Sequence, residues 1–389
     1  MSGVHIVLPG DDGGLRRHTM REAAAFPMPS RPFALRRCFA APHVVADARA
    51  EYTPGQTPPV DWDATIAFRR HLWSYGIGVA EAMDTSERGP GGLTWPQARE
   101  LIRRSLEAGA EAGGAIVCGA GTEQLTEPRP SLSAIANAYS EQVEFIESHG
   151  GSAVIRASHA LAAAARTPRD YLDTYGKVLS RATRPVIVHW LGTVFDPALA
   201  GYWGHHDLDE AAKIVLEFAH RHHDRLDGIK FSLLDADREE RFRKELPAGV
   251  RVYTGDDYDY PRLLLGDGDS FSHGLLGVLD PIGPIASAAL QALEAGDEAA
   301  YLTTMGSTVP LAVRMFEAPA SSYKTGVVFL AYLSGHQSHF RMVSGREGMR
   351  SIRHLADLFV LADRLGLFPD PGLAAHRMRQ VLALSGIDQ

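Results

Sequence analysis

The chain has 389 residues, of which 45% are hydrophobic and 22% charged, an ordinary composition for a globular enzyme. Its net charge of −8, without a clustered basic face, argues against a nucleic-acid surface. No apolar run approaches the roughly 20 residues that span a bilayer. The N-terminus lacks a basic-then-apolar signal, so we expect a cytoplasmic protein without membrane partners.

Apolar strand-like runs alternate with amphipathic helical runs after an irregular arm over residues 1–32. This alternation is typical of βα units around a parallel sheet. The predicted strands cover residues 33–45, 76–84, 115–120, 152–158, 185–191, 226–233, 250–255 and 270–279. The predicted helices between them cover 61–75, 94–112, 133–149, 167–182, 207–225 and 284–295. Eight strands with regular crossovers favour a closed (β/α)8 TIM barrel over an open doubly wound sheet.

The C-terminal part of the chain reads as helical. Residues 323–334, 349–365 and 373–384 have strong helical patterns separated by glycines. We therefore divide the chain into an arm (1–32), a barrel (33–300) and a C-terminal helical subdomain (301–389). That subdomain would either cover the barrel mouth or form a contact in a homo-oligomer, and the sequence leaves both open.

Lys230 is one of only five lysines among the 39 basic residues, and it lies within an apolar, strand-like run. A buried lysine can lose its proton and form an imine, whereas arginine cannot. A solvated or ion-paired lysine is the competing interpretation of the same residue.

The motifs around this lysine resemble the class I aldolase superfamily of dihydrodipicolinate synthase and N-acetylneuraminate lyase. More narrowly, the chain is similar to a bacterial branch described only as dihydrodipicolinate synthase-like. The resemblance covers about residues 33–333. Residues 228–232, Gly-Ile-Lys-Phe-Ser, match the family's sixth-strand motif with the imine-forming lysine at Lys230. Residues 253–257, Tyr-Thr-Gly-Asp-Asp, resemble the seventh-strand motif, and residues 266–268 and 185–192 resemble the glycine-rich segment and the fifth strand.

Three departures argue against dihydrodipicolinate synthase itself. The family's fifth-strand tyrosine is replaced by His189, and its carboxylate-binding arginine falls on Val194. The second-strand Gly-Thr-Thr-Gly-Glu is replaced by residues 83–87, Met-Asp-Thr-Ser-Glu. The resemblance then implies a Schiff-base carbon–carbon lyase, without a cofactor or metal, that acts on a 2-oxo acid or keto sugar derivative.

In this interpretation Lys230 is the nucleophile and His189, which titrates near ~6.5, carries protons. A barrel presents its active site at the carboxyl ends of its strands, where both residues are predicted to lie. Arg156 could replace the missing carboxylate anchor, since a guanidinium binds carboxylates through two hydrogen bonds. The other candidate substrate-binding residues are Glu81, Asp84, Thr85, His159, Asp256 and Ser272.

Two other functions remain open. A divalent-metal barrel isomerase or lyase would draw its ligands from strand ends, because carboxylates with imidazole suit Mn²⁺, Mg²⁺ or Zn²⁺. Its possible ligands are Glu81, Asp84, His159, His189, Asp256 and His273. A catalytically inactive barrel that binds a metabolite is the other alternative, because a fold does not fix a function.

Overall fold

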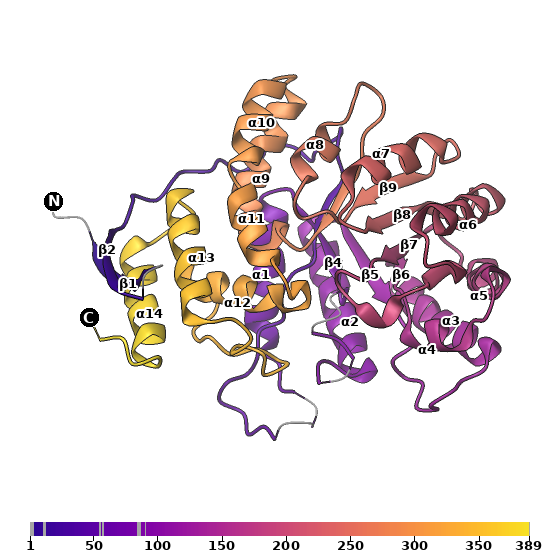
Figure 1. Ribbon diagram of the computed structural model, residues 1–389, viewed down its shortest axis with the longest axis horizontal. Coiled ribbons are helices and arrows are strands. Elements are labelled where there is room, and N and C mark those ends of the chain that lie inside the picture. Colours follow the sequence, from indigo (N-terminus) through magenta and orange to yellow (C-terminus); the bar gives the residue numbers. More distant parts are fainter. Residues whose placement is uncertain are drawn as a thin grey trace.

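Eight parallel strands close into a barrel, and the hairpin of β1 (His5–Pro9) and β2 (Leu15–Thr19) and the last helices lie together on one side of it (Figure 1). The computed structural model describes residues 4–10, 13–53, 56, 58–83, 87–89 and 91–388. The strands follow chain order around the barrel, and the last pairs with the first: β3 (Cys38–Ala40), β4 (Gly78–Glu81), β5 (Ile116–Ala120), β6 (Ala153–Ile155), β7 (Val186–Leu191), β8 (Leu226–Ser232), β9 (Arg251–Thr254) and β10 (His273–Leu276). Each lies within a predicted strand, so the predicted TIM barrel is confirmed.

Helices follow every barrel strand and form the outer layer. They are α1 (Trp62–Ser74), α2 (Trp95–Ala112), α3 (Leu132–Ser148), α4 (His159–Ala164), α5 (Pro168–Arg181), α6 (Leu208–Arg221), α7 (Ala236–Glu245), α8 (Tyr260–Leu265) and α9 (Leu279–Glu294). Two of them begin with a capping box and a proline in the first turn, after Thr94 and Thr167. Proline is tolerated there because the first helical N–H groups have no intrahelical acceptor.

The segment predicted as a C-terminal subdomain consists of further helices packed against α9 and the barrel, and it keeps that name below. Its helices are α10 (Glu298–Gly306), α11 (Val309–Phe316), α12 (Tyr323–Leu333), α13 (Ile352–Arg364) and α14 (Pro371–Ala383). A single buried apolar cluster joins α9 to α11–α14. The predicted boundary at residue 300 falls inside α10, which packs on α9 and α8.

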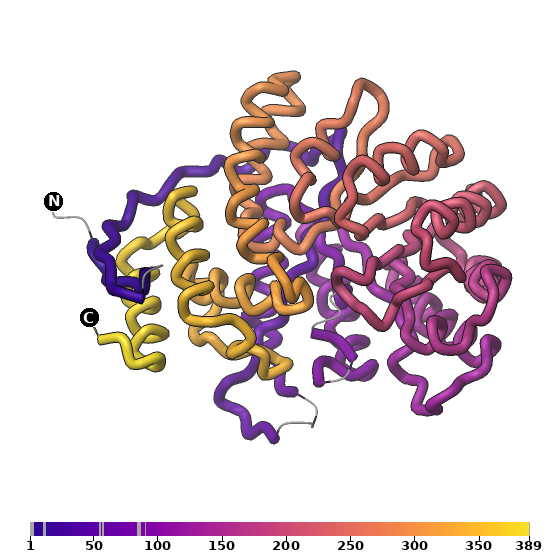
Figure 2. The backbone as a smooth tube through the Cα atoms, in the orientation of Figure 1, coloured from indigo at the N-terminus to yellow at the C-terminus, as the bar shows by residue number. Residues whose placement is uncertain are grey.

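The N-terminal arm is not irregular throughout, in contrast to the prediction. Strands β1 (His5–Pro9) and β2 (Leu15–Thr19) pair as an antiparallel hairpin. Ile6 and Leu8 are buried, and the hairpin contacts α13 and α14. His18 Nε2 lies 2.8 Å from the carboxylate of Asp363 on α13. The indigo N-terminal segment thus lies beside the yellow C-terminal helices (Figure 2).

The barrel interior is packed with side chains from every strand except β8. Because side chains alternate across a strand, paired positions on neighbouring strands face the same side. The interior cluster comprises Phe39, Ala41, Ala80, Met83, Val117, Val154, Ile187, Tyr253 and Leu275. After Val154 on β6 and Ile187 on β7, the next interior positions toward the carboxyl ends carry Arg156 and His189.

Candidate active site

Lys230 lies on β8 with its side chain directed into the barrel. It pairs in register with His189 on β7 and with Tyr253 on β9. Since Tyr253 belongs to the interior cluster, its paired neighbours Lys230 and His189 face the interior as well. Lys230 is half-buried and is the third residue from the carboxyl end of β8, the end at which barrel enzymes bind their substrates.

Gly255 allows the backbone after β9 to approach this lysine closely. A Cβ atom on Gly255 would lie 2.0 Å from the hydroxyl oxygen of Ser232 and 3.1 Å from Cε of Lys230. A side chain at position 255 would therefore displace both residues. The glycine of the 253–257 motif thus keeps β8 and the β9 loop together around Lys230.

His189 and Ser232 form a polar pair beside Lys230. The distance from His189 Nε2 to Ser232 Oγ is 3.0 Å, and both residues are buried. Burial, together with the charges of Lys230 and Arg156, holds the pKa of His189 well below its ordinary value. The imidazole is therefore neutral near pH 7 and can accept a proton, a requirement for a general base.

Asp257 adds a buried carboxyl group to the same region. Its Oδ1 accepts a hydrogen bond of 2.9 Å from the backbone N–H of Val278. Burial raises the pKa of Asp257 to about 7, against the opposing effects of the Val278 bond and of the charge of Lys230. A carboxyl group that titrates near neutrality can both give and take a proton.

Lys324 reaches the barrel from the C-terminal subdomain. This residue of α12 is fully buried, and its Nζ donates a 2.8 Å hydrogen bond to the carbonyl oxygen of Ala41, directly after β3. Nζ also lies 3.9 Å from Oε2 of Glu87, and its charge lowers the pKa of Asp257. The C-terminal helices therefore contact the carboxyl ends of the strands on the β3 side.

Arg156 lies directly after β6 and is 5% exposed. Its Nη1 is paired with the carboxylate of Glu123, which Arg88 also contacts at 3.3 Å. Glu123 therefore lies between two guanidinium groups, and the charges of Arg88 and Arg156 lower its pKa to about 2 against the effect of burial. The carboxylate partner of Arg156 in the structure is therefore Glu123.

A cavity of about 1380 Å³ opens over β5–β7. Arg156, Ser158 and Leu191 form part of its wall on the barrel, whereas Ser321 and Arg346 belong to the C-terminal subdomain. Lys230 and His189 do not line this cavity. The cavity instead begins at Arg156, the residue after the end of β6, and at Leu191, which pairs with Ser232.

His159 and Asp256 occupy different parts of the strand ends. His159 is exposed at the cavity, where its Nε2 pairs with the carboxylate of Asp196. It begins α4 rather than ending a strand. Asp256 is buried after β9, and its Oδ1 accepts hydrogen bonds from the N–H groups of Tyr258 and Asp259. Its Oδ2 is buried with no hydrogen-bond partner in the described part of the chain.

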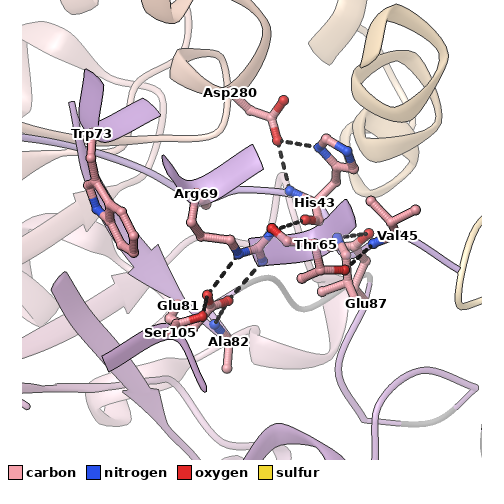
Figure 3. Close-up of polar contacts among 12 residues, drawn as sticks. His43, Val45, Thr65, Arg69, Trp73, Glu81, Ala82, Glu87, Ser105 and Asp280 are labelled. Carbon is pink, nitrogen blue, oxygen red and sulfur yellow. Dashed lines mark hydrogen bonds and ion pairs between the residues drawn. The ribbon is translucent and has the colours of Figure 1, made fainter. Parts of the chain in front are cut away.

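Glu81 faces away from the barrel interior (Figure 3). Its two carboxylate oxygens accept hydrogen bonds from Nε and Nη2 of Arg69 on α1, at 2.9 and 3.0 Å, and from Ser105 on α2. Arg69 also donates to the carbonyl oxygen of His43, whose N–H and imidazole bind Asp280. This buried network connects the helices to the loop after β3, so we leave Glu81 out of the proposed substrate contacts.

Ser272 also lies outside the barrel interior. Its hydroxyl donates to Glu239 on α7 at 2.6 Å and accepts from Arg243 at 2.9 Å. Both partners belong to the outer helix layer, so we do not place Ser272 at the substrate. Asp84 and Thr85 fall outside the described residues.

No metal-binding cluster or membrane helix emerges from the described residues. No group of three or more His, Cys, Asp or Glu side chains in the described ranges could hold a metal ion. Likewise, none of their helices is long and apolar enough to cross a membrane. The alternative of a metal-dependent enzyme therefore gains no support from the described side chains.

Four residues of this region were not predicted from the sequence as site residues. Ser232 and Asp257 lie in the quoted motifs, so their position beside Lys230 was available as a signal. Lys324 and Arg346 come from the C-terminal subdomain, more than 90 residues after Lys230. Only the scarcity of lysine pointed to Lys324, and nothing in the sequence pointed to Arg346.

Comparison with solved structures places this barrel among known folds. It is similar to a provisionally assigned dihydrodipicolinate synthetase from Pseudomonas aeruginosa, with 16% identity, a TM-score of 0.60, and coverage of 84% of this chain and 99% of that chain. Dihydrodipicolinate synthase from Aquifex aeolicus is 14% identical, with a TM-score of 0.61 and coverage of 86% of this chain and 99% of that chain. The chloride-inhibited dihydrodipicolinate synthase from Acinetobacter baumannii, complexed with pyruvate, is 15% identical, with a TM-score of 0.56 and coverage of 76% of this chain and 90% of that chain. The predicted resemblance is confirmed at the level of the fold.

Two sequence comparisons complete these findings. The model of a protein family of unknown function, DUF993, matches residues 6–387. No curated protein matches the sequence significantly.

Proposed function

This chain belongs to the DUF993 family of proteins of unknown function, and we propose that it is a Schiff-base-forming carbon–carbon lyase of the class I aldolase type. The single observation that carries the proposal is the position of Lys230. It lies half-buried near the carboxyl end of β8, in register with a buried histidine and beside a buried carboxyl group. The shared fold with dihydrodipicolinate synthases supports the same chemistry but does not name the substrate.

The proposed reaction begins when the unprotonated amine of Lys230 attacks the carbonyl carbon of a 2-oxo acid or keto sugar derivative. The carbonyl oxygen leaves as water after it takes up protons, and a protonated imine remains. In the cleavage direction, the electron pair of the broken C–C bond moves into the imine and gives an enamine. Protonation of the enamine carbon and hydrolysis then release the second product and restore the amine.

His189 supplies the proton transfers in this scheme. In the cleavage direction, its neutral imidazole takes a proton from the hydroxyl group on the carbon that is being split off. In the condensation direction, it returns that proton. Ser232 lies 3.0 Å from His189 Nε2 and can pass a proton between His189 and the hydroxyl group of the carbinolamine, which then leaves as water. Asp257 assists the loss of water because a carboxyl group with a pKa of about 7 is partly protonated at neutral pH.

Borohydride trapping tests the covalent step. The protein is incubated with pyruvate or a panel of 2-oxo acids and sodium borohydride, and its intact mass is measured. We expect one adduct per chain on the native protein and none on Lys230→Met. Lys177→Met is the matched control, because Lys177 is an exposed lysine on α5. An adduct that persists on Lys230→Met would refute the assignment of the nucleophile.

A metabolite-binding barrel without catalysis is the second candidate. It is favoured by one observation, namely that Lys230 and His189 do not line the 1380 Å³ cavity. In that case a 2-oxo acid would raise the melting temperature of both the native protein and Lys230→Met. No borohydride adduct would form on either.

We also propose that the protein acts in the cytoplasm as a homo-oligomer that binds a small keto compound without a cofactor. Light scattering on the purified chain measures the number of subunits directly. Full trapping activity after exhaustive dialysis against a chelator is the expected result for an enzyme without a metal.

A further inference from the structure

The cavity over β5–β7 is much larger than a small keto acid requires. Its volume of about 1380 Å³ exceeds the range of roughly 300–1,000 Å³ that is usual for small-molecule sites. A three-carbon 2-oxo acid bound by Lys230, which does not line the cavity, would leave this volume unfilled. The cavity is therefore available to the distal part of a longer ligand, which would face the wall contributed by the C-terminal subdomain.

Three arginines line this cavity, and two of them are already engaged. Nη1 of Arg88 donates to the carbonyl oxygens of Ala82 and Gly119, and its Nη2 contacts Gln142 and Glu123. Arg156 is paired with the same Glu123. These two guanidinium groups and one carboxylate form a buried polar floor in which both cations share Glu123. Nε of Arg88 and Nε of Arg156 have no hydrogen-bond partner in the described part of the chain.

Arg346 differs from the other two because it forms no ion pair within the described residues. The adjacent carboxylate of Glu347 is held by Arg341 at 2.7 Å and by the backbone N–H of Met342 at 3.3 Å. The two other cavity carboxylates do not neutralise Arg346, since Asp196 is paired with His159 and Glu127 is exposed.

The segment that carries Arg346 is fixed in place. The hydroxyl of Thr325 on α12 donates a 2.8 Å hydrogen bond to the carbonyl oxygen of Arg346. Met342 forms a bridge with Val45 in the loop after β3, and the N–H of Gly345 closes a turn onto the carbonyl oxygen of Met342. A held backbone reduces the entropy that a side chain loses when it binds a ligand.

We propose that Arg346 binds an anionic group, a carboxylate or a phosphate, at the end of the substrate remote from the reacting carbonyl. This inference rests on the proposed function only in taking the other end of the substrate to be the carbonyl group that reacts with Lys230. A guanidinium suits both anions because its planar donors match their oxygens.

Matched ligand pairs test this site without requiring imine formation. Isothermal titration compares gluconate with sorbitol for the carboxylate, and glucose 6-phosphate with glucose for the phosphate. We expect one anion to bind the native protein about tenfold or more tightly than its neutral partner, the usual worth of a charge-assisted hydrogen bond. The pair that shows the difference identifies the anion.

Substitutions then assign the effect to one side chain. Arg346→Gln should remove the preference for the anion, and Arg346→Lys should retain part of it. Arg364→Gln, which removes an exposed arginine of α13 outside the cavity, should leave it unchanged. The inference is overturned if neither anion is preferred by the native protein, or if Arg346→Gln keeps the full preference. Pyruvate trapping on native protein and on Arg346→Gln reports separately on the lyase proposal, because pyruvate is too short to have a distal anionic group.

Discussion

The imidazole Nε2 of His189 lies 3.0 Å from the hydroxyl oxygen of Ser232, on the neighbouring strand and one interior position nearer the barrel mouth than Lys230. This pair places a neutral base and a hydroxyl group on the same side of the lysine. Their buried hydrogen bond also restricts the imidazole to a narrow range of orientations.

His189→Phe should therefore separate imine formation from turnover. We expect borohydride trapping on Lys230 to continue, whereas cleavage or condensation slows by about 10²–10⁴-fold, the usual contribution of a positioned acid or base. Single-turnover kinetics with a trapped-mass assay measures both steps on one sample. If the variant traps and turns over at the native rates, His189 does not carry the proton.

The charge of Lys324 should be detectable at Asp257. Lys324 lowers the pKa of the Asp257 carboxyl, which burial raises to about 7. Lys324→Met removes that cation, so the Asp257 pKa should rise further. Infrared titration of the carboxyl C=O band, assigned with Asp257→Asn, gives the pKa in each protein. Lys177→Met is the control because its lysine is exposed on α5. An unchanged band midpoint in Lys324→Met would contradict the coupling.

Removing one partner of the buried pair between Arg69 and Glu81 should strongly destabilise the fold. Both side chains are fully buried, so Arg69→Met leaves an uncompensated carboxylate, at a cost of about 3–5 kcal/mol in unfolding free energy. The double variant Arg69→Met, Glu81→Met should recover much of that loss. Urea denaturation measures each value. Arg103→Gln breaks partly exposed helix pairs and should lower the unfolding free energy far less, because solvent screens such pairs. Equal losses for Arg69→Met and Arg103→Gln would contradict this account.

Glu239 should make stability decrease with rising pH. Burial between α7 and the barrel raises its pKa from 4.5 to about 8, so the folded state binds a proton more tightly than the unfolded state. The corresponding stability is fully present below about pH 4.5 and is lost as the pH rises through about 8. Glu239→Gln, which cannot titrate, should show a smaller loss of unfolding free energy between pH 5 and pH 8.5. Parallel curves for the two proteins across this interval would exclude the effect.

The strands were predictable because their apolar runs are short, rich in β-branched residues and bounded by glycine or polar residues. The shortest outer helices were not predicted, and α4, α7 and α8 show why. Helices α4 and α8 have six residues each, and α7 is strongly polar, so none presents a long apolar stripe.

Whether a predicted site residue faces the barrel interior depends on which alternate residues of its strand point inward. Ala80 faces the interior, so Glu81, the next residue, faces the helices, where Arg69 binds it. A run of apolar residues buried on both faces gives no alternation from which to choose the phase. Lys230 and His189 were placed correctly in the interior because a recognised motif fixed their position, whereas Arg346 depends on tertiary packing that no local pattern encodes.

The hairpin β1–β2 packs against helices that lie more than 300 residues later in the sequence. Its partners, α13 and α14, are the final helices of the chain, and both termini lie at the same end of the molecule (Figure 1). During synthesis the ribosome therefore releases the first segment long before its binding surface exists. The barrel residues separate the hairpin from the helices on which it packs, so the hairpin can reach its final place only after α13 and α14 have been made.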